Sequence, residues 1–151
     1  VGSGPFPTEL FDETVNTIRQ IGHEYGAVTG RERRCGWIDL VALRYAIMLS
    51  GVTKLIMMKS DVLDGFDTIK ACDAYEIGGE VVRDFPYTVT DDLKPIYTEI
   101  KGWKTDMTKF NDEAQFPKEF NDYIAYLEEK LGVPITIVSV GPDREQTIIR
   151  K

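Results

Sequence analysis

Three arginines fall within four residues in the segment Thr29-Gly30-Arg31-Glu32-Arg33-Arg34. Positive charges this close together repel one another unless something negative lies nearby. The glycines at positions 26 and 30 allow the backbone to turn sharply and to come close to a ligand, and Thr29 adds a hydroxyl group. Guanidinium groups bind carboxylate and phosphate through two parallel hydrogen bonds. The segment therefore predicts an anion-binding loop, and the alternative is an ordinary solvated basic turn.

A second polar cluster, Lys59-Ser60-Asp61, follows the apolar run Lys54-Leu55-Ile56-Met57-Met58. The run is typical of a strand buried on both faces, and ligands bind just past the carboxyl ends of such strands. Guanine presents two adjacent donors that one carboxylate accepts together, whereas adenine would leave that carboxylate unpaired. Asp61 is therefore a candidate guanine-reading group, and the Lys59 stem is long enough to lie along the base. The Lys-x-Asp spacing is common, so a solvated strand end is the alternative.

The third candidate loop is Ser139-Val140-Gly141-Pro142-Asp143-Arg144, which follows the apolar run 135–138. Its backbone groups are suited to closing over a base or a sugar. An ordinary turn between two strands is the alternative interpretation.

Helices and strands must position these three loops. Apolar residues at helical spacing predict a first helix capped by Thr8 and ending at Gly22. They also predict a second helix over residues 37–50, buried on two sides, and a third that Pro117 opens and Gly132 ends. In the third helix Glu128, Glu129 and Lys130 are expected to form the solvated face.

The remaining segments predict strands and loops. Residues 68–103 are typical of an antiparallel β excursion, residues 104–116 of a loop, and residues 146–149 of a final strand. Helices alternating with buried strands predict an α/β fold.

Composition narrows the function. The 151 residues are 42% hydrophobic, which is enough for one core, so a single domain spanning residues 1–151 is expected. The formal net charge of −7 argues against a general nucleic-acid or membrane-surface binder. No apolar run is long enough to span a bilayer, and no signal peptide is recognisable. The start at Val1, without an initiator Met, indicates a piece of a longer chain.

The sequence predicts no metal site. Cys35 and Cys72 lie far apart and His23 is the single histidine, which argues against a Cys/His zinc site, and packed thiols are expected. His23 is expected to be a surface or helix-capping residue. The carboxylates of Asp64, Asp67, Asp91 and Asp92 are not accompanied by a phosphate-binding Gly-rich lysine loop, so no magnesium site is predicted from them.

Four segments together resemble the C-terminal third of adenylosuccinate synthetase, and the resemblance runs from Val1 to about Arg150. In chain order they are residues 1–10, 26–37, 59–65 and 139–144. The resemblance implies the C-terminal part of a mostly parallel central sheet with flanking helices and an antiparallel β excursion. It also implies a cytoplasmic, homodimeric ligase of purine and AMP biosynthesis.

The family's reaction joins IMP with L-aspartate at the expense of GTP, giving adenylosuccinate, GDP and phosphate. The γ-phosphoryl group passes first to the purine oxygen of IMP, and the aspartate amine then displaces it with the help of Mg²⁺. The family's phosphate loop, catalytic Asp and His, and magnesium ligands belong to its N-terminal part. The resemblance therefore implies no catalytic or metal-binding residue here, and we expect the chain to be inactive alone.

The resemblance also implies roles for individual residues. Thr29 and the loop's backbone N–H groups would hold the aspartate carboxylates, Arg31 would bridge aspartate and IMP, and Arg33 would also reach GTP. The aspartate and IMP set comprises Val1, Ala27, Val28, Thr29, Gly30, Arg31, Glu32 and Arg33. The GTP set comprises Arg33, Lys59, Ser60, Asp61, Ser139, Val140 and Gly141.

Three positions depart from the family pattern. Val28 stands where a second threonine is common, so one hydroxyl contact is lost. Glu32 lowers the positive charge of the loop, and Met58 replaces a threonine and is expected to face the sheet. The alternatives to a synthetase fragment are a non-catalytic GTP- or anion-binding module and a dimerisation module.

Overall fold

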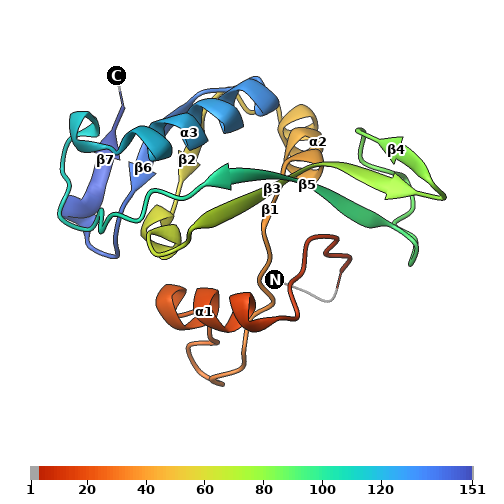
Figure 1. The fold of residues 1–151 in the computed structure, drawn as a ribbon, viewed down its shortest axis with the longest axis horizontal. Helices are drawn as coiled ribbons and strands as arrows, with labels where there is room; N and C mark the ends of the chain where they lie inside the picture. Colours follow the sequence, from red (N-terminus) through yellow and green to blue (C-terminus); the bar gives the residue numbers. More distant parts are fainter. Residues whose placement is uncertain (1–3, 151) are drawn as a thin grey trace. The chain divides into compact units, whose positions relative to one another are not determined.

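The computed structural model describes residues 4–150 as a mixture of helices and strands (Figure 1). The helices are α1 (Glu13–Gly22), α2 (Leu40–Ser50) and α3 (Lys118–Leu131). The chain divides into two compact units. Unit one comprises Val1–Ala42 and Lys70–Thr98, and unit two comprises Leu43–Ile69 and Glu99–Lys151. None of the helices in residues 4–150 combines the length and apolar character needed to cross a membrane.

The sheet of unit one centres on β3 (Thr68–Ile77), most of which belongs to that unit. Strand β1 (Ile38–Asp39) pairs with β3 in parallel, and β4 (Glu80–Val82) pairs with it antiparallel. Strand β5 (Lys94–Lys101) also pairs with β3. The turn between β3 and β4 uses two glycines at positive φ, Gly78 and Gly79. The predicted antiparallel hairpin is therefore confirmed.

The core of unit one holds buried Val41, Cys72 and Tyr75. The Tyr75 hydroxyl donates to Asp39 Oδ2 at 2.5 Å, and Asp39 Oδ1 accepts the N–H of Ala42 at 3.0 Å. Asp39 thereby satisfies an N-terminal N–H of α2, which begins at Leu40 and not at the expected residue 37. Burial raises the pKa of the Cys72 thiol to about 12, which fits the packed thiol that was predicted.

Helix α1 begins later than the sequence predicted. Asp12, not Thr8, caps it by accepting the N–H of Thr14 at 2.9 Å. Thr8 is fully buried, and its hydroxyl donates to the carbonyl of Trp37 at 2.7 Å, so the capping role given to Thr8 was wrong. His23 ends the helix in the left-handed conformation, as the predicted capping residue.

Unit two contains a three-stranded sheet in the order β2-β6-β7, formed by Leu55–Met57, Ile135–Ser139 and Thr147–Ile149. Strand β2 is parallel to β6, and β7 is antiparallel to β6. Helix α3 starts after Pro117 and ends at Gly132, as predicted. Its apolar stripe is buried throughout and consists of Phe120, Tyr123, Ile124, Leu127 and Leu131.

Two predictions of burial were wrong. In α2 only Leu40 and Val41 are buried, while Met48 and Leu49 are each 66% exposed. Ile56 in β2 is 57% exposed and Met58 is 66% exposed, so Met58 does not lie against a covered sheet face. For β2 the physical reason is that it is an edge strand within the described residues, with β6 as its one partner there.

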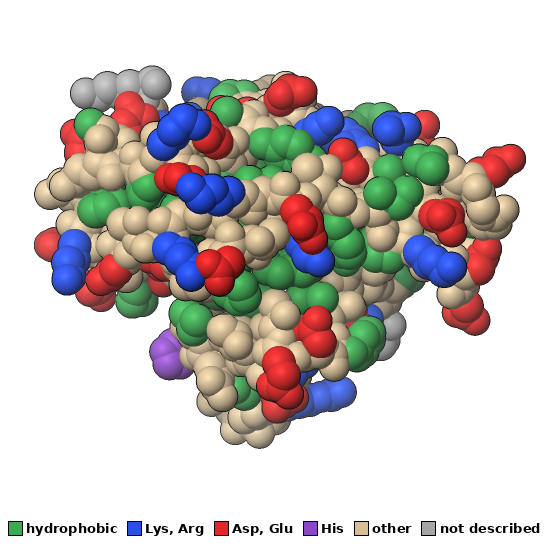
Figure 2. All heavy atoms as spheres, in the orientation of Figure 1, with side chains coloured by type: hydrophobic (Ala, Val, Ile, Leu, Met, Phe, Trp, Pro, Cys, Tyr) green, Lys and Arg blue, Asp and Glu red, His purple; other side chains and the backbone are tan. Residues whose placement is uncertain are grey.

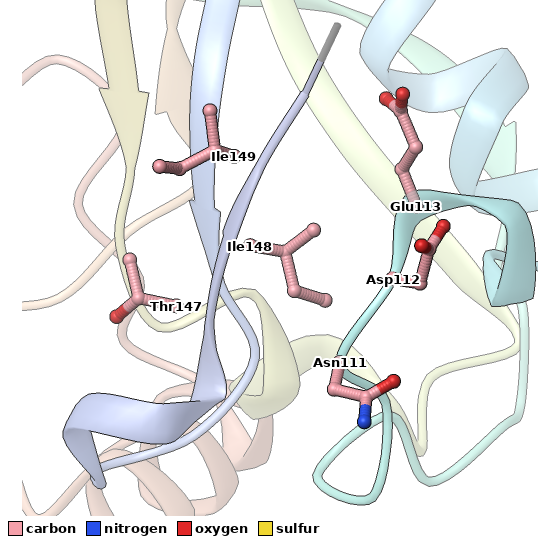
Figure 3. A pocket seen from close by; sticks show the side chains of 6 residues that line it. All are labelled: Asn111, Asp112, Glu113, Thr147, Ile148 and Ile149. Atoms are coloured by element: carbon pink, nitrogen blue, oxygen red, sulfur yellow. The ribbon is translucent and has the colours of Figure 1, made fainter.

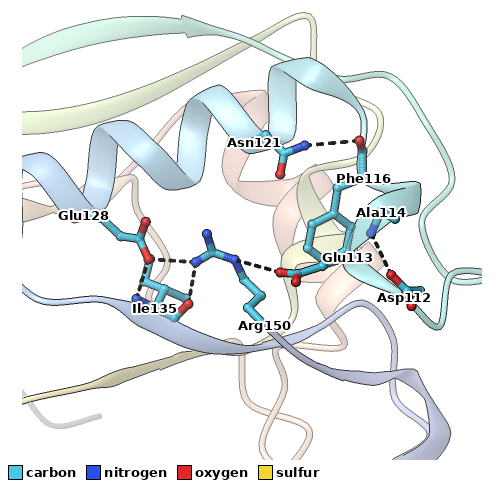
Figure 4. A network of polar contacts seen from close by, with 8 residues as sticks. All are labelled: Asp112, Glu113, Ala114, Phe116, Asn121, Glu128, Ile135 and Arg150. Atoms are coloured by element: carbon cyan, nitrogen blue, oxygen red, sulfur yellow. Dashed lines mark hydrogen bonds and ion pairs between the residues drawn. The ribbon is translucent and has the colours of Figure 1, made fainter.

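Glu128 belongs to a polar network and not to the solvated face of α3 (Figure 4). Its Oε1 accepts the backbone N–H of Ile135 and Nη1 of Arg150, each at 2.7 Å. Arg150 Nη1 also donates to the carbonyl of Ile135, and Arg150 Nε lies 3.9 Å from Glu113 Oε2. The network ties α3 to β6 and to the residue that follows β7.

Replacing Glu128 should therefore destabilise the chain. Glu128→Ala leaves the Arg150 guanidinium and the Ile135 N–H without this acceptor, at a cost of about 1–3 kcal/mol. The neighbouring Glu129→Ala is the matched control because Glu129 is exposed on the same helix. Urea unfolding followed by circular dichroism measures both, and equal unfolding free energies for the two variants would contradict the role of the network.

Candidate functional site

The arginine loop of unit one forms a hairpin. Gly26 N–H donates to the carbonyl of Arg31 at 2.8 Å, and Gly30 N–H donates to the carbonyl of Gly26 at 2.8 Å. Tyr25 and Glu32 form an antiparallel bridge at its base, and Gly30 takes the positive φ of 65° that the turn requires. The exposed tip consists of Ala27, Val28, Thr29 and Gly30.

Two of the three clustered arginines are ion-paired. Arg33 Nη1 lies 2.9 Å from Glu24 Oε2, and Arg34 Nη2 lies 2.6 Å from Glu9 Oε2. The hydrogen bond from Arg34 lowers the pKa of Glu9. The Arg34 guanidinium also lies over the Phe6 ring, 5.4 Å from its centroid, so Arg34 fastens the loop to the start of the described chain.

Arg31 differs from its neighbours. It is exposed and has no ion-pair partner among residues 4–150, and its backbone N–H donates to Thr29 Oγ1 at 3.3 Å. Glu32 lies 3.2 Å from Arg19 Nη1, and Arg19 Nε donates to the carbonyl of Arg33 at 2.9 Å. Because Glu32 is held by Arg19, the positive charge of Arg31 stays available to an anion.

The second and third candidate loops lie together in unit two. Strands β2 and β6 run parallel with Met57 opposite Val138, so the segments that follow them leave the same edge of the sheet. Ser60 Oγ donates to the carbonyl of Ser139 at 2.8 Å, and Ser139 Oγ donates to the carbonyl of Gly141 at 2.9 Å. Both serines are almost fully buried. The structure thus joins Lys59–Asp61 to the 139–141 turn, while their roles toward a ligand stay predictions.

Asp61 immediately follows Ser60, the residue that joins these two loops. Its Oδ1 is buried and has no hydrogen-bond partner within the described part of the chain. Burial raises the pKa of Asp61, and the charge of Lys59 is among the effects that oppose this rise. Lys59 takes a left-handed conformation, with φ of 57°, immediately before the 3₁₀ helix η1 (Ser60–Leu63). A buried carboxylate oxygen without a donor costs free energy, which a ligand with N–H groups would recover.

Asp64 directly follows η1 and connects this segment to residues 103 and 107. Its Oδ1 accepts Nε1 of Trp103 at 2.6 Å, and its Oδ2 accepts the N–H of Met107 at 2.8 Å. Burial raises the pKa of Asp64, as it does for Asp61, but here both oxygens have donors. Asp67 is paired with Lys104. Residues 4–150 contain no group of three His, Cys, Asp or Glu side chains arranged to hold a metal ion.

One residue of this region, Gln146, was not predicted from the sequence. Its Oε1 accepts the N–H of Asp143 at 2.8 Å, its Nε2 donates to the carbonyl of Thr108 at 2.8 Å, and its own carbonyl accepts the N–H of Val140. Gln146 therefore closes the 139–146 turn. The available signal was the Asp-x-x-Gln spacing of a capping box, from Asp143 to Gln146.

A cavity of about 300 Å³ in unit two lies beside β7 (Figure 3). It is lined by Asn111, Asp112, Glu113, Thr147, Ile148 and Ile149. None of these is a residue that the sequence predicted to bind substrate. The chemistry predicted for unit two is at the Asp61 and Ser139 loops, and not in this cavity.

The molecular surface carries charges of both signs. On the face shown in Figure 2, Asp and Glu side chains are interspersed with Lys and Arg. This face offers no continuous basic surface of the kind that nucleic-acid binding requires.

Comparison with known proteins agrees with the resemblance found in the sequence. The family model for adenylosuccinate synthetase matches residues 1–148. The curated adenylosuccinate synthetases of Parabacteroides distasonis and Bacteroides fragilis are each 69% identical over 150 residues, which is 99% of this chain and 36% of theirs. The solved structure of fully ligated adenylosuccinate synthetase from Plasmodium falciparum is 35% identical, with a TM-score of 0.93 over 100% of this chain and 37% of that one.

These matches and the parallel strand pairs define an α/β synthetase fold. The chain belongs to the adenylosuccinate synthetase family. It spans about a third of the length of the curated relatives that it matches.

The buried Asp61 carboxyl makes stability depend on pH. Burial raises its pKa above the ordinary value of 3.8, so between the unfolded and folded pKa values the folded chain binds more protons. The contribution of Asp61 to stability therefore falls as the pH rises through this window, and it stays lower above it. Asp61→Asn has no proton to lose, so it should raise the melting temperature at neutral pH and reduce that fall.

Thermal unfolding of the 151-residue chain from about pH 3 to about pH 7 checks this expectation. Asp91→Asn, at an exposed carboxylate, is the control and should follow the wild-type profile. A melting temperature for Asp61→Asn at neutral pH that is no higher than that of the wild type would show that Asp61 carries no burial penalty.

Proposed function

We propose that this chain is the part of an adenylosuccinate synthetase that contacts guanine, L-aspartate and IMP. The complete enzyme would catalyse the GTP-dependent ligation of IMP and L-aspartate to adenylosuccinate, in AMP biosynthesis. The observation that carries the proposal is the buried Oδ1 of Asp61, which has no hydrogen-bond partner within residues 4–150 and follows Ser60, the residue bonded to the carbonyl of Ser139. Membership of the family supplies the reaction.

The guanine assignment follows from the state of Asp61. Its carboxylate would accept the ring N–H and the exocyclic amine of guanine together, which gives the orphan oxygen a donor. Binding would stabilise the ionised form and lower the pKa that burial has raised. Lys59 would lie along the base, and the backbone of residues Ser139, Val140 and Gly141 would pack against it. Adenine has no such pair of donors, so it would leave the carboxylate unsatisfied.

The aspartate and IMP assignment rests on the loop of unit one. Arg31 is the exposed cation without a partner in the described chain, and Thr29 and the exposed backbone of the tip supply further donors. Val28 is 98% exposed and offers no hydroxyl to a carboxylate. Arg33 is paired with Glu24, so its contact with substrate would require that pair to open. Val1, the proposed contact to the IMP ribose, lies outside the described residues.

The catalytic and magnesium-binding residues would come from the part of a synthetase that this chain does not span. Magnesium would be bound there, since the Asp64 carboxylate is already occupied by Trp103 and Met107. GTP is the co-substrate of the proposed reaction, and the complete enzyme is proposed to be a cytoplasmic homodimer. The second candidate function is a non-catalytic GTP- or anion-binding module, which the same two sites would support.

Base selectivity tests the guanine assignment. We use a chimera in which this chain replaces the matching third of the Parabacteroides distasonis enzyme. Asp61→Asn should lower kcat/KM for GTP by about tenfold to a hundredfold and bring it close to that for ITP, which lacks the exocyclic amine. Asp67→Asn, at an 83% exposed side chain nearby in sequence, is the control.

An unchanged ratio of GTP to ITP in Asp61→Asn would refute the guanine assignment. The isolated 151-residue chain serves as the baseline and should form no adenylosuccinate. Formation of adenylosuccinate by the isolated chain would show that it contains groups that catalyse phosphoryl transfer.

Aspartate kinetics test the arginine loop in the same chimera. Arg31→Leu removes a charge-assisted contact, so the KM for aspartate should rise at least about tenfold while the KM for GTP changes little. Lys54→Leu removes one positive charge from an exposed site outside the candidate loops and controls for net charge. An aspartate KM equal to that of the wild type would count against the loop as the aspartate site.

A further inference from the structure

The side-chain amide of Gln146 is hydrogen-bonded through both its oxygen and its nitrogen. It accepts the N–H of Asp143 and donates to the carbonyl of Thr108, both at 2.8 Å. The backbone of Gln146 makes two further bonds, from its N–H to the carbonyl of Asp143 and from the N–H of Val140 to its carbonyl. One residue therefore connects both ends of the turn to a segment 38 residues away.

The same amide occupies the space beside Gly141. A Cβ added at Gly141 would lie 2.2 Å from Gln146 Oε1 and 2.4 Å from Gln146 Cδ. Atoms do not approach this closely, so a side chain at position 141 and the present position of the Gln146 amide exclude one another. The amide cannot swing aside freely, because it would have to give up its bonds to Asp143 and Thr108. Gly141 is thus required by Gln146 and not by its own backbone conformation, since Gly141 is absent from the residues with positive φ.

A continuous path of contacts leads from Gln146 to Asp61. The amide packs on Gly141, the Gly141 carbonyl accepts Ser139 Oγ, and the Ser139 carbonyl accepts Ser60 Oγ. Ser60 immediately precedes Asp61 in the chain. Displacement of the Gln146 amide would therefore shift the turn that faces the base and loosen the serine that holds the Asp61 segment.

We infer that Gln146 is a positioning residue for guanine recognition. It fixes the 139–143 turn at the place where the base packs, and it does so without touching the nucleotide. The inference rests on the proposed function, because it needs guanine to bind between this turn and Asp61. Gln146 would then influence base selectivity indirectly, by holding the residues that contact the base.

The chain supplies a matched control in Gln115. This residue closes a second capping box, in which its Oε1 accepts the N–H groups of Asn111 and Asp112 at 2.9 and 3.1 Å. Both glutamines stand at the third position of a 3₁₀ turn that carries a capping box. Of these two side chains, the one with a described contact to the 139–141 turn is that of Gln146. A purely structural effect should therefore be shared by both glutamines, whereas an effect on base selectivity should belong to Gln146.

The test uses the chimera and compares Gln146→Leu with Gln115→Leu. For Gln146→Leu we expect a rise in the KM for GTP, a fall of about tenfold in the ratio of kcat/KM for GTP to that for ITP, and an unchanged KM for aspartate. For Gln115→Leu the selectivity ratio should stay within about twofold of the wild type. Melting temperatures of both variants separate loss of stability from loss of selectivity.

A double-mutant cycle provides a second arm that does not depend on Gln146→Leu folding. Gly141→Ala alone should reduce selectivity, because the new methyl group displaces the amide. In a Gln146→Ala background the methyl group has room, so Gly141→Ala should cause little further loss. Additive losses in this cycle would contradict the role of the amide at Gly141.

The outcomes separate the two proposals. If Asp61→Asn abolishes selectivity for GTP while Gln146→Leu retains the wild-type ratio, the positioning role is wrong and the guanine assignment stands. If Asp61→Asn itself retains the ratio, the guanine assignment is wrong. Equal loss of selectivity in Gln115→Leu and Gln146→Leu would also overturn the inference, since it would show a general effect of stability.

Discussion

One buried hydrogen bond, from Ser60 Oγ to the carbonyl of Ser139, connects segments 79 residues apart in the chain. The parallel pairing of β2 and β6 brings the ends of both strands to one edge of the sheet, but pairing alone does not fix the loops that follow. The bond is made between two almost fully buried serines, where water does not compete with it. The relation of Asp61 to the 139–141 turn therefore depends on this contact.

Asp61 and Asp64 lie close together in the chain but differ in whether their carboxylate oxygens are hydrogen-bonded. Burial raises the pKa of both carboxyls, yet Asp64 has donors on both oxygens while Asp61 Oδ1 has none within the described chain. Asp64 fixes η1 by holding Trp103 and Met107. Asp61 lies in η1, and its Oδ1 has no donor within the described chain. An unsatisfied buried group of this kind is typical of a site that a ligand completes, because stability is given up there for selectivity.

Sequence patterns predicted the elements whose stability is local. The apolar stripe of α3 and its Pro117 and Gly132 ends were correct because periodicity and end signals agree there. The burial of β2 was wrong because burial depends on which segments lie against a strand, and periodicity contains no such information. Glu128 was misassigned for a similar reason, since its partner Arg150 lies 22 residues away. The candidate loops were predicted from clustered charge and from polar segments that follow apolar runs, and the family motifs gave their proposed roles, whereas the contacts that orient the loops needed coordinates.

In the arginine loop, the sequence motif does not determine which arginines are ion-paired within the chain. The sequence presents three equivalent cations, but Glu9 and Glu24 neutralise Arg34 and Arg33, and both acidic partners are distant enough in sequence to escape a motif. Arg31 is then the charge that an incoming anion meets first, while Arg33 must exchange a partner before it can contribute. Under the proposed function, an anion that engages both arginines would have to compensate for the broken pair with Glu24, and a dicarboxylate would offer one carboxylate to each arginine.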